Sequence, residues 1–168
     1  MGSSYSGSYN GTNGSSQPFA ESYEVCKPMY KKDITDPDIY NPNTGYYKNP
    51  TATKIEDAIS ADKIKIGDKV PNGPITYVMD TNGNIIIGKR SNPNNPNARS
   101  PHPMLIGGKH PEVQCAGMIT FKNGKIVSVD NQSGHFKPHI NSLDKVDTAL
   151  SELAKKHPEI FDRNSKWR

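Results

Sequence analysis

Two short segments of this sequence combine histidine with glycine and proline in a way that suits acid–base chemistry. One runs from Ser100 to His110 and the other from Asn131 to His139. Glycine lets a backbone approach a ligand closely, and proline restrains the loop around it. Imidazole is the side chain best poised to exchange protons near neutral pH. These segments are therefore the first candidates for a catalytic site.

We predict four catalytic residues from these segments. Two imidazoles and a lysine can serve as base, acid and electrostatic clamp when a phosphodiester is cleaved without a metal ion. A serine in the same loop can orient one of the imidazoles. The four residues are His102, His135, Lys137 and Ser133. One alternative stays open, in which the histidines cap strands or hydrogen-bond to the backbone in loops.

A basic segment surrounds these candidates. Residues 85–140 carry a net charge of +5, whereas the rest of the chain carries −1. Four of the five histidines lie in the same segment. This placement favours a phosphate-bearing partner such as RNA, although a solvated basic surface would have the same composition. The predicted substrate-binding residues are Lys109, His110, Arg99 and Gly108.

The sequence predicts no metal ligands. His135 and His139 have a helical ligand spacing, but Pro138 lies between them and disfavours a helix. The two cysteines, Cys26 and Cys115, are too few for a Cys-rich zinc site. Cys115 lies in a predicted strand and is expected to be a small core residue. A disulfide between the two cysteines stays open.

An ADP-ribosyltransferase is a second candidate activity, and it would use NAD as its cofactor. Such enzymes usually carry a glutamate near the end of a strand, and Glu112 is the only glutamate of the basic segment. No Glu-x-Glu pair occurs, and the glycine-rich fingerprints of phosphate loops and dinucleotide folds are absent. Apart from this alternative, we predict no cofactor.

The composition divides the 168 residues into three parts. Residues 1–17 are uncharged and rich in Gly, Ser and Tyr, which is typical of a flexible linker. Residues 18–52 form a turn-rich extended arm with many tyrosines, and residues 53–168 form the globular domain. No apolar run approaches the roughly 18 residues that a membrane span needs, so we expect no membrane insertion.

Two hairpins are predicted within the globular part. Residues 75–79 and 85–87 flank a turn at Asp80–Asn84. Residues 118–122 and 125–129 flank the pair Asn123-Gly124, which tolerates the positive φ angles of a two-residue type I′ turn.

Two helices accompany these hairpins. The apolar residues of Ser142–Lys156 recur with helical spacing and predict a C-terminal helix. Pro158 would end this helix. Thr53-x-x-Glu56 is a capping-box pattern that predicts a short helix. The chain is therefore predicted to be α+β, an antiparallel sheet of two hairpins with a C-terminal helix and one further short helix packed on it.

The stretch from Ile75 to Pro138 resembles a module at the C-terminal ends of bacterial polymorphic toxins of the Rhs and contact-dependent kinds. A related module occurs in the plant IQM calmodulin-binding proteins. The matching segments are His102 to Gly108, Ala116-Gly117, Asn123-Gly124 and Ser133 to Pro138. Pro103 and Met104 replace two serines of the family pattern, and Phe136 replaces a tyrosine, whereas both histidines are retained.

The resemblance implies an effector toxin domain that is secreted or delivered as part of a larger toxin and acts in the cytoplasm of a target cell. It also implies a cognate immunity protein, for which an acidic surface facing the basic segment is expected. The histidine pair with its lysine and the basic segment favour a metal-independent ribonuclease as the activity of that domain. The alternatives are an ADP-ribosyltransferase toxin and a non-enzymatic module that binds its target.

Overall fold

The computed structural model describes residues 17–26, 29–48, 52–67, 69–88, 91–92, 95–99 and 101–167, with only the backbone described at 91–92 and 95–99. The predicted linker, residues 1–17, lies outside this description apart from Gln17. The strands are β1 (Tyr23–Glu24), β2 (Tyr40–Asn41), β3 (Tyr46–Tyr47), β4 (Thr53–Lys54), β5 (Ile59–Ser60), β6 (Lys63–Ile64), β7 (Gly73–Met79), β8 (Ile85–Gly88), β9 (Ser91–Asn92), β10 (Asn95–Arg99), β11 (Glu112–Val113), β12 (Cys115–Lys122) and β13 (Lys125–Val129). The helices are α1 (Lys31–Ile34) and α2 (Leu143–Lys156), with 3-10 turns η1 (Ile55–Ala58), η2 (His102–Leu105), η3 (Ile140–Ser142) and η4 (Pro158–Ile160).

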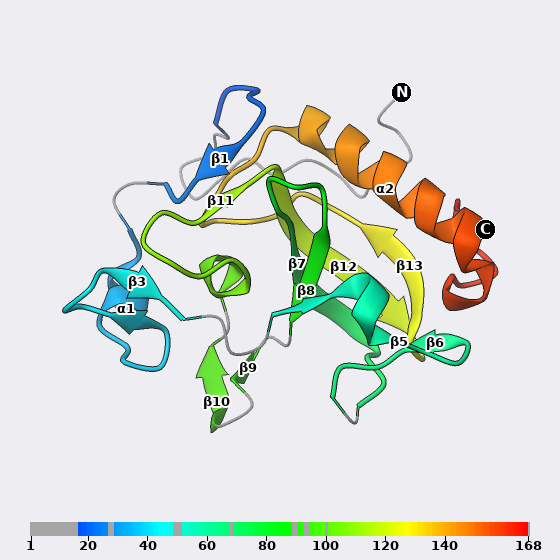
Figure 1. Cartoon of the computed structure of the whole chain (residues 1–168), viewed down its shortest axis with the longest axis horizontal. Coiled ribbons are helices and arrows are strands. Elements are labelled where there is room, and N and C mark those ends of the chain that lie inside the picture. Colours follow the sequence, from blue (N-terminus) through cyan, green and yellow to red (C-terminus); the bar gives the residue numbers. More distant parts are fainter. Residues whose placement is uncertain are drawn as a thin grey trace.

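A five-stranded antiparallel sheet forms the centre of the molecule, in the order β13-β12-β7-β8-β4 (Figure 1). Both predicted hairpins, β7–β8 and β12–β13, are present, and β12 pairs with β7 from Cys115↔Met79 to Phe121↔Gly73. The predicted α+β class is thus confirmed. The edge strand β4 was not predicted, because two residues carry no periodic signal.

The β12–β13 turn has the predicted geometry. Asn123 and Gly124 have φ angles of 53° and 82°, both in the left-handed region that a type I′ turn requires. Lys122 and Lys125 pair across this turn. On β12, Ile119 and Phe121 are buried whereas Lys122 is exposed, as the alternating pattern predicts.

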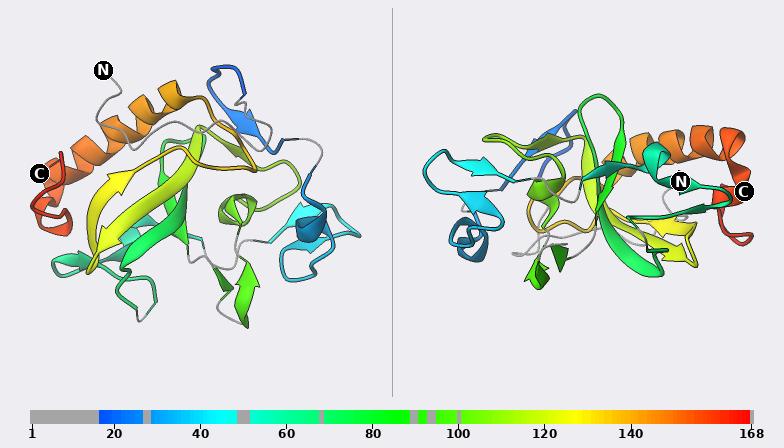
Figure 2. Two further views of the ribbon diagram at one scale, coloured as in Figure 1. Left: turned by 180° about the vertical axis from the view of Figure 1, so that it is seen from behind. Right: turned by 60° about the horizontal axis from the view of Figure 1, so that its bottom comes forward.

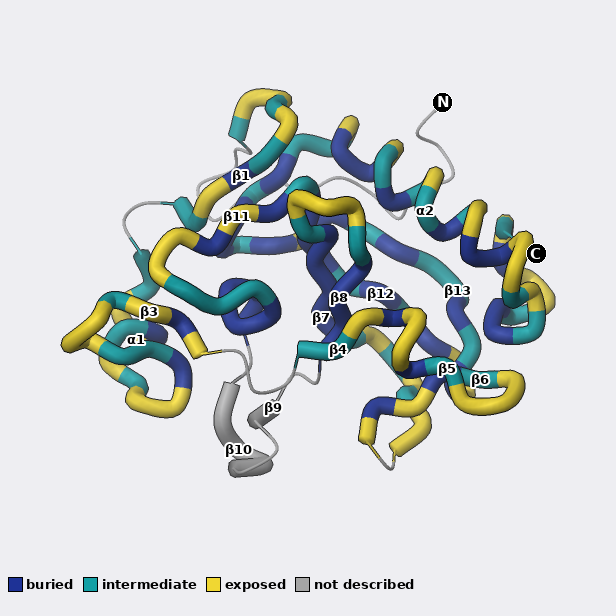
Figure 3. The backbone as a smooth tube through the Cα atoms, viewed as in Figure 1, coloured by how far each residue is buried: buried dark blue, intermediate teal, exposed yellow. Residues whose placement is uncertain are grey.

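Helix α2 covers one face of the sheet. It begins one residue after the predicted start, and its buried stripe consists of Leu143, Val146, Leu150, Leu153 and Ala154. These side chains pack against sheet residues that include Tyr77 and Met79. Figure 3 shows the stripe as buried segments that alternate with exposed ones along the helix.

The second face of the sheet is also covered, which the sequence did not predict. Because side chains alternate along a strand, Val78 points away from the side of Tyr77 and Met79. It packs in a separate cluster with Leu105 of η2 and Phe136 of the loop after β13. This second face carries the two histidine segments.

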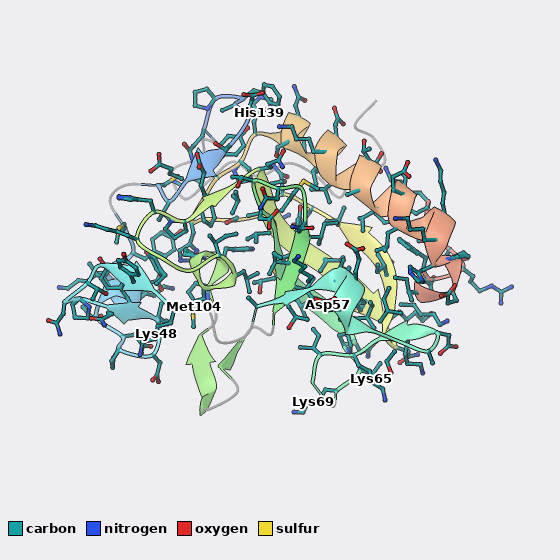
Figure 4. The ribbon with its side chains drawn as sticks, viewed as in Figure 1. Lys48, Asp57, Lys65, Lys69, Met104 and His139 are labelled. Carbon is teal, nitrogen blue, oxygen red and sulfur yellow. The ribbon has the colours of Figure 1, made fainter. Side chains whose placement is uncertain are left out.

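The arm docks at one end of the molecule, beside η2 and away from the C-terminus (Figures 1 and 2). Its strand β3 joins the body through paired backbone hydrogen bonds between Tyr47 and Gly108, at 2.8 and 2.9 Å. Ile39 and Tyr47 of the arm form a small buried cluster with Met104 of η2, which Figure 4 labels. The arm is therefore packed onto the domain through both backbone and side chains.

The predicted capping box at Thr53 is wrong. Thr53 lies in β4 and pairs with Ile87, and the short helix is the 3-10 turn η1, without a side-chain cap. Its residues Ile55 and Ala58 do pack on the sheet, as predicted. Pairing with β8 keeps Thr53 extended, and this tertiary contact overrides the local pattern. In the described part of the chain, no helix is long and apolar enough to cross a membrane.

Candidate functional site

Three of the four predicted catalytic residues come together on the second face of the sheet. His102 opens η2, whereas Ser133 and His135 lie in the loop that follows β13. The ring centroids of His102 and His135 are 6.3 Å apart, although 33 positions separate them in the sequence. Both side chains are buried, with 6% and 7% of their surface exposed.

His102 is held by hydrogen bonds at both ring nitrogens. Its Nε2 lies 2.7 Å from the carbonyl oxygen of Gly117, and its Nδ1 lies 3.2 Å from Oγ of Ser133. Since a carbonyl only accepts, Nε2 carries the proton of the neutral ring and Nδ1 accepts from the serine hydroxyl. Oγ of Ser133 in turn accepts from the N–H of Phe136 at 3.3 Å. Ser133 therefore holds the His102 ring through a hydrogen bond.

Gly117 positions the carbonyl that His102 contacts. A Cβ atom at Gly117 would lie 2.1 Å from the carbonyl oxygen of Asp130, so no larger residue fits there. The Asp130 carboxylate accepts from the N–H groups of Met118 and Gln132 at 2.8 and 3.0 Å. Burial raises the pKa of Asp130 above its usual range, against the lowering effect of these hydrogen bonds.

His135 is paired with a carboxylate that the sequence did not reveal. Its Nε2 lies 2.5 Å from Oδ2 of Asp33, a fully buried residue of α1 in the arm. The carboxylate holds the ring in the form that carries its proton on Nε2. Nδ1 of neutral His135 then has a free lone pair, and no hydrogen bond to it occurs among the described residues. An imidazole oriented in this way is suited to act as a general base.

One tyrosine of the arm contacts His135, and a second is buried where the arm packs against η2. The Tyr30 ring lies 4.4 Å from the His135 ring, centroid to centroid. The Tyr47 hydroxyl is buried and has no hydrogen-bond partner among the described residues. Burial raises the pKa of Tyr47 to about 12, and the negative charge of Asp33 adds to this shift. Tyr30 and Asp33 thus bring the arm into contact with His135.

Lys137 adjoins this site but faces the N-terminal segment. It has a left-handed backbone with φ of 46°, and its N–H donates to the carbonyl of Ser133 at 2.7 Å. Burial raises the pKa of the Cys26 thiol, and the positive charge of Lys137 opposes that shift. In the described part of the chain, no contact between Lys137 and either imidazole is present.

The predicted substrate-binding residues occupy different surroundings. Lys109 and His110 are exposed on the loop after η2. The N–H and carbonyl of Gly108 both bond to Tyr47, so this amide is already used by the arm. The side chain of Arg99 lies outside the described residues.

The two cysteines are not joined. Cys115 is fully buried, and its sulfur accepts a hydrogen bond from Ser142 at 3.1 Å. Burial raises its pKa, which fits the predicted core role. Among the described residues, His, Cys, Asp and Glu side chains form no group of three or more that could hold a metal ion.

Comparisons with models of protein families, with curated proteins and with solved structures found no match. The geometry of the site provides a carboxylate-oriented imidazole and a second imidazole that is hydrogen-bonded to a serine. These groups can move protons at two points a few ångströms apart.

Proposed function

We propose that this chain is an effector toxin domain that cleaves RNA without a metal ion. The observation that supports this most is the buried pair of His135 and Asp33, with the second imidazole of His102 6.3 Å away, centroid to centroid. A base and an acid at neighbouring positions are what cleavage at a ribose 2′-hydroxyl needs. The basic segment around them favours a polyanionic substrate.

In the proposed reaction, Nδ1 of His135 takes the proton from the ribose 2′-hydroxyl. The freed oxygen attacks the adjacent phosphorus while the bond from phosphorus to the 5′-oxygen breaks. In the acid form, His102 carries an additional proton on Nδ1, which it donates to Oγ of Ser133 while the Ser133 hydroxyl gives its own proton to the leaving 5′-oxygen. The products are a 2′,3′-cyclic phosphate and a 5′-hydroxyl end, with His135 protonated and His102 neutral. Lys137 and Lys109 are the proposed phosphate contacts.

We further propose how this toxin domain is delivered and how it is neutralised. The domain would be delivered as part of a larger toxin and would act in the cytoplasm of the target cell. A cognate immunity protein would neutralise it through an acidic surface that faces the basic segment. Both proposals are based on the resemblance of the two histidine segments to the C-terminal modules of polymorphic toxins.

The experiment is incubation of RNA with the purified chain in the presence of a chelator and without NAD. We expect cleaved RNA with cyclic phosphate ends, and loss of cleavage in His135→Ala. His157→Ala is the matched control, because His157 lies beyond the end of α2 and its side chain pairs with Glu159 at 3.3 Å. Intact RNA would contradict the proposal. Label transfer from NAD would then favour an ADP-ribosyltransferase, and toxicity that survives loss of both imidazoles would favour a binding module.

A further inference from the structure

Gln17 links the histidine loop (residues 130–139) to the end of β1. Its N–H donates to the carbonyl of Lys137 at 2.8 Å. Its side-chain Nε2 donates to two further carbonyls, that of Phe136 and, at 3.1 Å, that of Glu24. Two carbonyl acceptors fix the NH2 end of the carboxamide at this place, because a carbonyl oxygen cannot donate. Gln17 therefore joins the loop to the segment around β1 through both its backbone and its side chain (Figure 1).

These bonds act on the part of the loop that carries the candidate base. The carbonyl of His135, one residue before Phe136, accepts a hydrogen bond from the N–H of Cys26 at 2.7 Å. Three consecutive carbonyls of the loop, at positions 135, 136 and 137, are thus bonded to the segment 17–26. The Nε2 atom of His135 is bonded in turn to the carboxylate of Asp33. A shift of this backbone would therefore move the imidazole away from its carboxylate.

The backbone of the histidine loop is strained at Lys137. Its φ angle of 46° is left-handed, which costs free energy for a residue other than glycine. Within the loop, the N–H of Lys137 donates to the carbonyl of Ser133 at 2.7 Å, and Nδ2 of Asn131 donates to the carbonyl of Pro138 at 3.0 Å. The two loop carbonyls that Gln17 binds belong to the peptide groups on either side of Lys137. Gln17 therefore stabilises the left-handed residue from outside the loop.

We propose that Gln17 is a positioning residue for His135, whose imidazole it keeps in line with the Asp33 carboxylate by holding the backbone of the histidine loop. Gln17 acts through this backbone, because its hydrogen bonds to the loop end on carbonyl oxygens. The proposal rests on the function given above, since His135 is the proposed base. The position of the imidazole can be measured without RNA, so the two proposals are tested separately.

The test compares Gln17→Ala and Gln17→Glu with the wild-type chain, because a carboxylate of nearly the same shape offers no donor to the two carbonyls. Without RNA, we expect the amides of Cys26 and Lys137 to exchange with solvent about tenfold faster in both variants. The ring N–H signal of His135 should weaken in proton NMR spectra, since this proton is protected by the bond to Asp33. With RNA, the cleavage rate should fall about tenfold.

Gln132→Ala is the control, because Gln132 is exposed in the same loop. It should match the wild-type chain in amide exchange, in the ring signal and in cleavage. Gln17 is half-buried, so both of its variants are expected to fold, and circular dichroism verifies this.

An unchanged ring signal in both Gln17 variants would overturn the proposal. If amide exchange is faster while the ring signal is unchanged, Gln17 supports the loop without positioning His135, and the proposal is again wrong. A weakened ring signal with cleavage at the wild-type rate would keep the positioning role but reject His135 as the base. If the wild-type chain leaves RNA intact, the ribonuclease function is rejected, whereas a weakened ring signal in the variants still supports the positioning role of Gln17.

Discussion

The carboxylate of Asp33 lies 2.5 Å from Nε2 of His135, although 102 positions separate the two residues in the sequence. Asp33 comes from the arm and His135 from the loop after the last strand. The candidate base is therefore complete only when the arm is docked on the body.

Replacing Asp33 should disable the base without removing it. In Asp33→Asn, the neutral amide replaces the carboxylate next to Nε2 of His135. It can no longer stabilise the positive charge that the imidazole gains when it accepts a proton. We expect RNA cleavage to fall about 100-fold, within the range of general-base effects. Asp38→Asn is the control, because Asp38 is an exposed acid of the same arm. The measurement is the initial cleavage rate, with circular dichroism to verify folding. Equal rates for both variants would contradict the pairing.

Gly117→Ala should be strongly destabilising. The new methyl group would have to displace the backbone of Asp130, which lies 2.1 Å from its position. We expect a loss of about 3 kcal/mol in the free energy of unfolding, at the upper end for overpacking. Gly83→Ala is the comparison, because a Cβ there meets nothing within 4 Å although φ is +87°. Urea unfolding of both variants checks this, and a larger loss at Gly83 would refute the steric account.

Asp130 should make stability fall as pH rises. Burial raises its folded-state pKa above the ordinary value of 3.8, so the folded protein binds this proton more tightly than the unfolded chain. The benefit of protonation is complete below 3.8 and is lost as pH rises through the folded-state pKa. Asp130→Asn retains an acceptor oxygen for Met118 and Gln132 and should remove this dependence. The check is the unfolding free energy against pH, where a constant difference between the two proteins would contradict the assignment.

The two thiols should differ in reactivity. Burial raises the pKa of both thiols, but Cys26 is partly exposed whereas Cys115 is fully buried. Since a thiol reagent must reach the sulfur, the folded protein should show one reactive thiol and the denatured protein two. Titration with a thiol reagent at mildly alkaline pH measures this. In Cys26→Ser the folded protein should show none, and a persistent reactive thiol there would mean that Cys115 is accessible.

Local patterns predicted the scaffold well. The Asn123-Gly124 turn and the apolar stripe of α2 each depend on neighbouring residues, and both were predicted within a residue or two. Thr53 was misread because its conformation is set by pairing with Ile87, a contact that no local pattern encodes.

The candidate site was predicted only in part, for the same reason. The histidines and Ser133 stand out by residue type beside glycine and proline. Asp33 does not, because its pairing with His135 depends on how the arm docks against the body. A buried aspartate in a turn-rich arm carries no sequence signal of its own.

The most direct measurement compares RNA cleavage by Asp33→Asn, His135→Ala and the double variant. If Asp33 acts only through His135, the double variant will cleave no more slowly than His135→Ala alone. If the two losses multiply, or if His135→Ala cleaves at the wild-type rate, the pair does not form the catalytic base and the account is wrong.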